Sequence, residues 1–401
     1  MNVRTVILHM NTTYNILSPM VSTERVFRVG VFTKPLDNWK SGSGHHLDEL
    51  MKHVLDLHDD HFEFTFIHYK KSDNPIYSRV HELLIPRNPL SASAVLRKEQ
   101  FDVVHYAPLS IFAPIQHIAS KKVATVHGVE EALFPQGYTA IQRLHFALIL
   151  PAYMRRMDRI ATVSETSKKY FVQHYAIPAN HVFITTNGLG AEYRILSEAE
   201  KKLPDELGIT KRFIFHISRY SARKNPITVI KGFARFIRET NADYQLVCAG
   251  TGWNCSEIQQ LTEKEGIREQ VITPGFISES LVVKLLNNAE AFVFPSFAEG
   301  FGMPNIEAMA CGCPVITSNS FAIPEVVGDA AIIMQQADSA QELASALSKI
   351  TNNPDQKKAL VQRGFKQIQQ YTWNNSAKAL LQAYGELCNG IVRKEYRDKN
   401  G

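Results

Sequence analysis

The chain is 401 residues long, which is more than one hydrophobic core usually supports, so we expect two or more domains. Its composition, with 45% hydrophobic and 21% charged residues, is that of an ordinary folded protein, and a net charge of +5 is too mild to indicate nucleic-acid binding. The five cysteines are odd in number and irregularly spaced, which favours buried free thiols over disulfides or a structural zinc site.

The first 24 residues are irregular and polar, and they lack the basic and apolar regions of a secretion signal. We predict that residues 1–24 form an extension before the first strand. The longest apolar run, residues 144–154, is about half the roughly 20 residues needed to cross a bilayer, and it contains Pro151. The sequence therefore predicts a cytoplasmic protein.

The first strand is predicted over residues 27–32, followed by a glycine-containing loop and a helix that ends near Leu57. Gly42 and Gly44 lie in this loop, so their backbone N–H groups are candidates for binding a phosphate at the helix N-terminus. The spacing is not a dinucleotide-binding fingerprint, because no third glycine follows at the required distance. An ordinary strand-to-helix loop is the alternative.

Two more strands, residues 62–68 and 101–105, and a helix over residues 109–119 precede a fourth strand over residues 122–126. His127 follows this last strand directly, at the edge of a sheet where ligands bind in open α/β folds. A hydrogen-bonded structural histidine is the alternative.

A basic helix is predicted over residues 144–157, with Arg155 and Arg156 beside an apolar side. This helix either buries its apolar side in the core or touches an anionic membrane surface. The next strand ends at Ser164, which has the chemistry of an N-cap for a helix over residues 165–174.

A second α/β series begins near Arg212 with a strand over residues 213–217. The loop after it carries Arg219, Arg223 and Lys224, and a helix follows over residues 227–239. An arginine fork together with a lysine charge can clamp a diphosphate, whereas solvated loop cations are the alternative. Later strands are predicted over 244–249 and 271–277, and helices over 278–288, 340–350, 357–371 and 373–387.

Two carboxylates, Glu299 and Glu307, lie in one strand–helix–strand unit over residues 292–317. Glu299 is on the loop after the first strand, and Glu307 is in a short helix, residues 305–310, so both can face one crevice. The free N–H groups at the start of this helix suit an anion. A solvated loop acid and a helix-start acid are the alternative.

This unit resembles the E-x7-E signature of the retaining glycosyltransferases of family GT4. The resemblance includes the EGFG turn, the EAMACG helix and residues 323–330, IPEVVGDA. It implies the GT-B fold, an α/β architecture of two Rossmann-like domains that face each other across a cleft. The expected parts are an acceptor-side domain over 25–195, a nucleotide-sugar domain over 196–372 and a crossover helix over 373–395, with Asn187-Gly188 as the hinge.

The resemblance also implies roles for individual residues. Arg219 and Lys224 are expected to clamp the diphosphate, Glu299 to bind the donor-sugar hydroxyls, and His127 to lie near the donor sugar and the acceptor. Glu307 is expected on the nucleotide ribose. The remaining donor-binding residues are expected to be Gly42, Gly44, Ile277, Gly300, Phe301, Gly302 and Met303, with no metal and no cofactor.

The implied activity is retaining, metal-independent transfer of a hexosyl group from a nucleotide-diphosphate sugar to a hydroxyl acceptor. The acceptor would be a glycan, a lipid-linked sugar or a small molecule, and peripheral contact with a membrane fits a lipid-linked one. The alternatives are a catalytically silent nucleotide-sugar-binding subunit and a sugar-nucleotide epimerase of the same fold.

Overall fold

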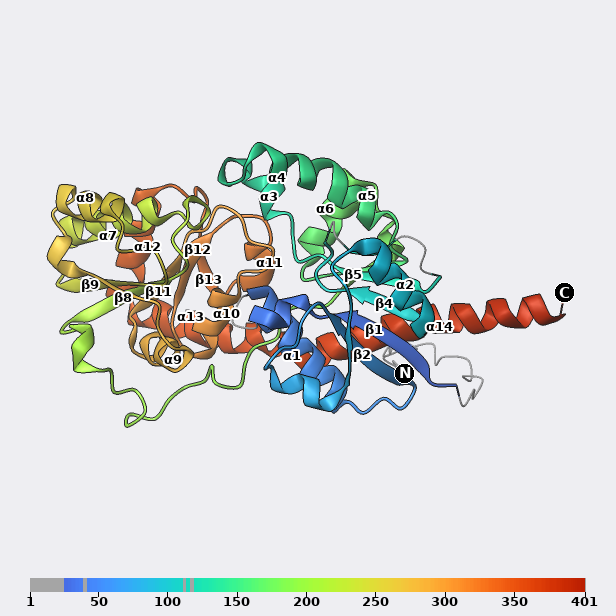
Figure 1. Cartoon of the computed structure of the whole chain (residues 1–401). Coiled ribbons are helices and arrows are strands. Elements are labelled where there is room, and N and C mark those ends of the chain that lie inside the picture. Colours follow the sequence, from blue (N-terminus) through green and yellow to red (C-terminus); the bar gives the residue numbers. More distant parts are fainter. Residues whose placement is uncertain (1–24, 39–41, 111–112, 116–118, 401) are drawn as a thin grey trace, which may run out of the picture.

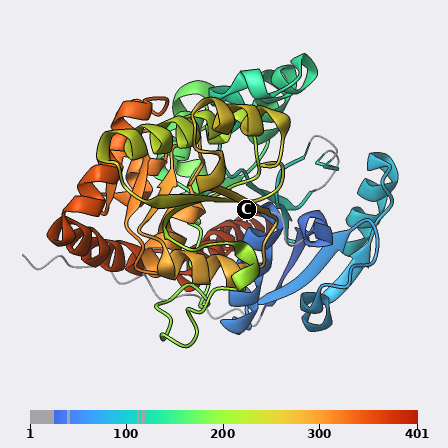
Figure 2. The same ribbon diagram turned by 90° about the vertical axis from the view of Figure 1, so that its left-hand side faces the viewer.

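The computed structural model describes residues 25–38, 42–110, 113–115 and 119–400, with side chains up to residue 389. The predicted extension, residues 1–24, lies outside the described residues. Two lobes lie side by side, and each is built around one sheet (Figure 1). The view in Figure 2 is turned so that the second lobe, in yellow and orange, lies in front of the first.

All described strand pairings within the two sheets are parallel. The first sheet has the order β3-β2-β1-β4-β5-β6-β7 and the second the order β10-β9-β8-β11-β12-β13. The strands of the first lobe are β1 (Phe27–Phe32), β2 (Phe62–His68), β3 (His81–Leu84), β4 (Val103–Tyr106), β5 (Lys121–Thr125), β6 (Arg159–Thr162) and β7 (Val182–Ile184). Those of the second lobe are β8 (Arg212–Ile217), β9 (Tyr244–Ala249), β10 (Val271–Gly275), β11 (Ala291–Phe294), β12 (Val315–Ser318) and β13 (Ala331–Met334).

Helices cover the sheets, as parallel strands require crossover connections. The first lobe contains α1 (Gly42–Asp56), α2 (Pro89–Glu99), α3 (Glu130–Leu133), α4 (Ala140–Leu144), α5 (Leu150–Met154) and α6 (Glu165–Tyr175). The second contains α7 (Pro226–Thr240), α8 (Ser256–Lys264), α9 (Glu279–Asn288), α10 (Met303–Ala310), α11 (Ile323–Val327), α12 (Ala340–Asn352) and α13 (Pro354–Gln367). The strands β4, β9, β11 and β12 are buried along their whole length, which explains their nearly continuous apolar sequences.

The strand order reverses once in each sheet, between β1 and β4 in the first and between β8 and β11 in the second. Loops that leave neighbouring strands on the two sides of such a point open a crevice at the carboxyl edge of the sheet. The loops after β8 and β11 carry Lys224 and Glu299. The topology therefore brings together residues that are 75 positions apart in the sequence.

The long helix α14 (Trp373–Asn400) belongs to the first lobe by its packing, although it follows the second lobe in sequence. Figure 1 shows it running past the first lobe to the C-terminus. Its residues Trp373, Leu380 and Tyr384 share one buried cluster with residues of β1 and α1. The Tyr384 hydroxyl also forms a 2.6 Å hydrogen bond with His105 Nδ1. The predicted crossover helix is confirmed, and it continues beyond residue 395 to Asn400.

Three local predictions differ from the structure. Gly42 and Gly44 were expected in a loop, but Gly42 is the first residue of α1 and Gly44 lies within its first turn. The described residues between 109 and 119 are not helical. The helix predicted over 144–157 instead runs from Ala140 to Met154, with a π-helical turn at His145–Ile149 between α4 and α5. The glycine spacing and the apolar composition did not define which backbone groups form hydrogen bonds in these segments.

Ser164 is the N-cap of α6, as predicted, because its hydroxyl accepts a 3.1 Å hydrogen bond from the Ser167 N–H. No described helix is both long and apolar enough to cross a membrane.

Candidate active site

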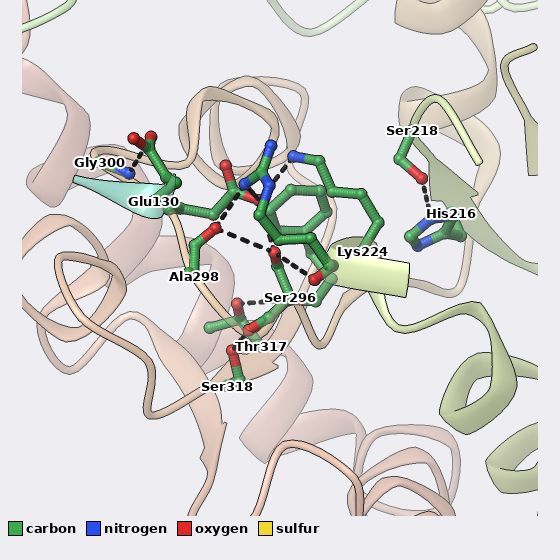
Figure 3. Close-up of polar contacts among 12 residues, drawn as sticks. Glu130, His216, Ser218, Lys224, Ser296, Ala298, Gly300, Thr317 and Ser318 are labelled. Atoms are coloured by element: carbon green, nitrogen blue, oxygen red, sulfur yellow. Dashed lines mark hydrogen bonds and ion pairs between the residues drawn. The ribbon is translucent and has the colours of Figure 1, made fainter. Parts of the chain in front are cut away.

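The centre of the site is the loop after β11, where Glu299 is only 7% exposed. Its carboxylate accepts hydrogen bonds of 2.5 Å from Lys224 Nζ and 2.5 Å from Ser296 Oγ, and it lies 2.9 Å from Arg223 Nη1. Figure 3 shows Lys224, Ser296 and Ala298 near one another in this network of polar contacts. Arg223 also donates a 2.5 Å hydrogen bond to the Ala298 carbonyl, so the loop after β8 is tied to the loop after β11.

Glu299 is ionised despite its burial. Burial by itself raises the pKa of a carboxyl group, but the charges of Lys224 and Arg223 outweigh it and hold the pKa of Glu299 below its usual value. Lys224 and Arg223 both face the Glu299 carboxylate, and the charge of Glu130 also acts on Arg223. An ammonium group beside a guanidinium group provides donors that suit a diphosphate.

Arg219 lies on the exposed start of the same loop, and no hydrogen bond or ion pair with the described residues is found for its side chain. Arg223, not Arg219, is the arginine that contacts Glu299. The sequence analysis named Arg223 as a cation of this loop but assigned the clamp to Arg219 and Lys224. The role of Arg219 in the clamp stays a prediction.

His127 lies at a point where the backbones of the two lobes approach each other closely. A Cβ atom on Gly300 would lie 2.7 Å from the His127 carbonyl oxygen, and one on Gly128 would lie 3.0 Å from Gly300 Cα. Only glycine permits so close an approach. Across the same contact the Gly300 N–H donates a 2.8 Å hydrogen bond to Glu130 (Figure 3). The structure thus brings His127 beside the loop of Glu299, although the two belong to different lobes.

Burial lowers the pKa of His127 to about 4, so its imidazole is neutral at pH 7. The neighbouring His46 has its ring perpendicular to that of His127, with 4.6 Å between the ring centroids. Its Nδ1 atom forms a 2.6 Å hydrogen bond with Asn187 Oδ1 in the predicted hinge. His46 therefore links the hinge to His127, a role that the sequence analysis missed because the two histidines are 81 residues apart.

Glu307 lies on α10, and its surroundings differ from those of Glu299. Burial, followed by the charges of Glu279 and Glu192, raises the pKa of Glu307 to about 8. Glu279 also accepts a 3.3 Å hydrogen bond from the Tyr193 hydroxyl. The two acids of the E-x7-E pattern thus have opposite pKa shifts, which indicates different tasks.

The other predicted donor-binding residues have different environments. Gly302 has a φ of +91° and is the N-cap of α10, a conformation that favours glycine. Phe301 is buried, and its ring packs edge-on against Tyr371, so only its backbone is free to meet a donor. Ile277 and Met303 are partly buried, and each packs against a hydrophobic cluster. A Cβ atom added to Gly42 would have no neighbour within 4 Å, so packing does not require a glycine there.

The two facing lobes and the cation cluster at the switch point define a class of protein, the nucleotide-sugar glycosyltransferases of the GT-B fold. Two family models match the chain: Glycosyl transferases group 1 over residues 199–367 and Glycosyltransferase Family 4 over residues 44–193. The chain belongs to glycosyltransferase family 4.

Curated relatives include mannosyltransferases. The O-antigen chain mannosyltransferase B of Escherichia coli is 27% identical over 314 residues, which cover 77% of this chain and 80% of that protein. The serotype-specific mannosyltransferase WbdA of E. coli is 24% identical over 290 residues, which are 71% of this chain but only 36% of that longer protein. The MMP alpha-(1->4)-mannosyltransferase of Mycolicibacterium hassiacum is 26% identical over 234 residues, which cover 57% of this chain and 54% of that protein.

Solved structures share the fold. Sucrose-phosphate synthase from Thermosynechococcus elongatus superimposes with a TM-score of 0.72 at 17% identity, covering 91% of this chain and all of that one. Anabaena Alr3699/HepE in complex with UDP and glucose has a TM-score of 0.72 at 16% identity, covering 90% of this chain and all of that one. These likenesses confirm the predicted GT-B fold.

Proposed function

We propose that this protein is a retaining, metal-independent mannosyltransferase that moves mannose from a nucleotide-diphosphate mannose to a hydroxyl group of a glycan. The observation that carries the proposal is the cluster of Lys224, Arg223 and Glu299 opposite His127. The names of the curated relatives support mannose as the sugar and a glycan as the acceptor.

In the proposed reaction the bond between C1 of mannose and the β-phosphate oxygen breaks, and a bond from C1 to the acceptor oxygen forms on the same face. The acceptor proton passes to the departing phosphate oxygen. Lys224 and Arg223, with Arg219 at the mouth of the loop, stabilise the charge that develops on the diphosphate. Glu299 binds donor-sugar hydroxyls, Glu307 binds the ribose, and closure of the two lobes excludes water.

A panel of GDP-mannose, UDP-glucose and ADP-glucose tests the donor. We expect GDP-mannose to raise the melting temperature most, and we expect the protein to release GDP from it slowly when no acceptor is present. With an acceptor, nuclear magnetic resonance of the product should show the anomeric configuration of the donor. Inversion of this configuration would contradict the proposed mechanism.

The same panel separates the rival functions. A silent binding subunit would be stabilised by a nucleotide sugar without releasing a nucleoside diphosphate. An epimerase would form a new nucleotide sugar, again without release. Replacing Glu307 by Ala should weaken binding of the nucleoside diphosphate in calorimetry, and an unchanged affinity would remove Glu307 from the ribose site.

We also propose peripheral contact with a membrane, which would fit a lipid-linked glycan as the acceptor. The helix α4 buries none of its side chains, and Ile141, Leu144 and Leu148 are 83%, 57% and 61% exposed. Apolar side chains presented together on one surface segment suit such contact. Flotation with anionic liposomes tests it, and a protein that stays at the bottom of the gradient would contradict it.

A further inference from the structure

A cavity of about 760 Å³ lies between the lobes and is lined by residues of both. The first lobe contributes Leu133, Phe134 and Gln136, from α3 and the turn that follows it. Most of the remaining lining comes from α7 and from the loops after β8 and β11 of the second lobe. Pockets of about 300–1,000 Å³ enclose drug-sized ligands, so this cavity has room for a disaccharide.

The cavity is separate from the proposed ribose site. The helices α7 and α12 pack in one buried cluster of the second lobe, and α10 packs in another. Successive residues of β9 alternate between these clusters, with Leu246 and Cys248 in the first and Val247 and Ala249 in the second. Since successive side chains of a strand point to opposite faces of a sheet, α7 and α10 cover opposite faces. Glu307, on α10, is therefore on the other face of the sheet from α7.

The first turn of α7 lines the cavity and has donors without a protein partner. Its N-cap residue, Asn225, does not cap the helix, because its side chain donates hydrogen bonds to the carbonyls of Pro295 and Ala337. The N–H groups of Ile227 and Thr228 form no hydrogen bond with a described residue. Such first-turn N–H groups take an acceptor from a side chain, from water or from a ligand.

The Thr228 hydroxyl is a further polar group without a partner. Thr228 is only 3% exposed and lines the cavity, and its hydroxyl forms no hydrogen bond within the described part of the chain. Buried polar groups are rarely left unpaired, so a ligand with hydrogen-bonding groups fits this position. Lys231, one turn further along α7, also lines the cavity and forms no ion pair with a described residue.

The charges of the lining disfavour an anion. The charged side chains among the described lining residues are Lys231, Glu257 and Asp338. The positive end of the α7 dipole adds about half a charge, so one ammonium group and two carboxylates leave no excess of positive charge. Carboxylates are good acceptors for hydroxyl groups, and Glu257 already accepts a 2.5 Å hydrogen bond from the Tyr220 hydroxyl. This mixture of donors and acceptors suits an uncharged ligand that is rich in hydroxyl groups.

The apolar part of the lining joins the two lobes. The rings of Phe134, in the first lobe, and Phe297, in the second, are stacked with 5.7 Å between their centroids and 11° between their planes. Together with Leu133 and Ile227 they present apolar surface to the C–H groups of a sugar ring. A ligand that touches both lobes binds their closed arrangement better than an open one, so it shifts the population toward closure.

We propose that this cavity binds an uncharged disaccharide and that the bound sugar favours closure of the lobes. The first turn of α7 and the Thr228 hydroxyl bind its hydroxyl groups from the second lobe, and Gln136 binds it from the first. The bound sugar is not a reactant, so the inference goes beyond the proposed function. Only its effect on the donor rests on that function, in which closure accompanies transfer. Linkage then requires the disaccharide and the donor to raise each other's affinity.

Hydrogen exchange of the full-length protein, followed by mass spectrometry, tests the binding. Mannobiose and maltose are uncharged disaccharides, and at least one of them should slow exchange about threefold or more over residues 222–231, because it pairs the free N–H groups of Ile227 and Thr228. Inorganic phosphate is the anionic probe. Stronger protection by phosphate than by either disaccharide, or no protection by any of the three, would overturn the proposal.

Two variants, Thr228→Val and Gln136→Ala, each remove one polar contact, and they do so from different lobes. Each should raise the dissociation constant of the protecting disaccharide about fivefold in the same measurement, as expected for the loss of one hydrogen bond. The matched controls are Thr240→Val, at the other end of α7, and Gln341→Ala, at an exposed glutamine of α12. Equal dissociation constants for all five proteins would exclude this cavity as the sugar site.

Calorimetry with GDP-mannose tests the effect on closure. A saturating amount of the protecting disaccharide should lower the dissociation constant of the donor about fivefold in the unmodified protein and in both controls, and less in both variants. An unchanged or raised dissociation constant would overturn the coupling. If the protein binds no nucleotide sugar, the proposed function fails, and hydrogen exchange still decides whether the cavity binds a sugar.

Discussion

At the scale of single residues, the site is a buried ion cluster of Glu299 with Lys224 and Arg223. Glu299 forms ion pairs with Lys224 and Arg223, the cations that the diphosphate would use. This pairing keeps the buried Glu299 carboxylate ionised. The hydroxyl groups of a donor sugar can donate hydrogen bonds to Glu299, while the donor phosphates accept hydrogen bonds from Lys224.

Replacing Lys224 by Ala should lower kcat about 10²-fold, because a positive charge aimed at the leaving group is lost from a water-poor site. Steady-state kinetics with the preferred donor measures this effect. Lys211→Ala is the matched control, since Lys211 pairs with Asp243 on the surface. Nearly normal turnover of the Lys224 variant would remove this residue from the clamp.

Glu307 should make the stability of the protein depend on pH. Its folded pKa, about 8, lies above the ordinary value of 4.5, so between these pH values the folded protein holds a proton that the unfolded chain has released. The stability contributed by this group is therefore lost as the pH rises from 4.5 to 8. The melting temperature of Glu307→Gln, relative to the unmodified protein, should rise steadily between pH 5 and pH 8, whereas that of Glu198→Gln should not. A constant difference across this range would contradict the raised pKa.

At the scale of elements, the N-terminus of α6 is capped by a side chain from the other lobe. The Glu325 carboxylate, on α11, accepts hydrogen bonds of 2.8 Å from the N–H groups of both Glu165 and Thr166. It also accepts a 2.6 Å bond from the Thr166 hydroxyl. A negative charge at a helix N-terminus is favourable, so this contact stabilises the helix and the closed arrangement of the lobes together.

Replacing Glu325 by Ala should destabilise the protein by about 1 kcal/mol, the usual cost of losing a helix cap. It should also increase the radius of gyration in small-angle X-ray scattering. Ser164→Ala removes a cap of the same helix that lies within the first lobe, so it should cost similar stability without opening the lobes. Equal radii of gyration for the two variants would show that Glu325 caps α6 without holding the lobes together.

At the scale of the whole molecule, closure depends on the backbone contact between Gly128 and Gly300. A methyl group on Gly300 would meet the His127 carbonyl at 2.7 Å, and the backbone would have to shift. Gly300→Ala should therefore keep the nucleotide affinity of the second lobe but reduce transfer about 10²-fold, because the reacting groups are displaced by roughly 1 Å.

The matched control for this prediction is Gly385→Ala, where an added Cβ has no neighbour within 4 Å. Calorimetry measures nucleotide binding, and initial rates measure transfer. Full transfer activity of Gly300→Ala would show that the lobes do not need this approach. A loss of nucleotide binding would instead place the effect in the second lobe alone.

Most strands and longer helices could be predicted because buried parallel strands have continuous apolar sequences and surface helices have periodic ones. The segments around Gly42 and between residues 109 and 119 could not, since glycine spacing and apolar composition do not fix which backbone groups pair. The raised pKa of Glu307 could not be predicted from the sequence either, because it arises from burial beside Glu279 and Glu192.

The sequence by itself determined the family and the two lobes, because an ordered motif around Glu299 and Glu307 and two α/β series are local features of the chain. Only the tertiary structure decided that Arg223 rather than Arg219 contacts Glu299 and that His46 adjoins His127. These pairings depend on which loops leave a sheet at the point where its strand order reverses. That property belongs to the assembled sheets and to no single segment of the chain.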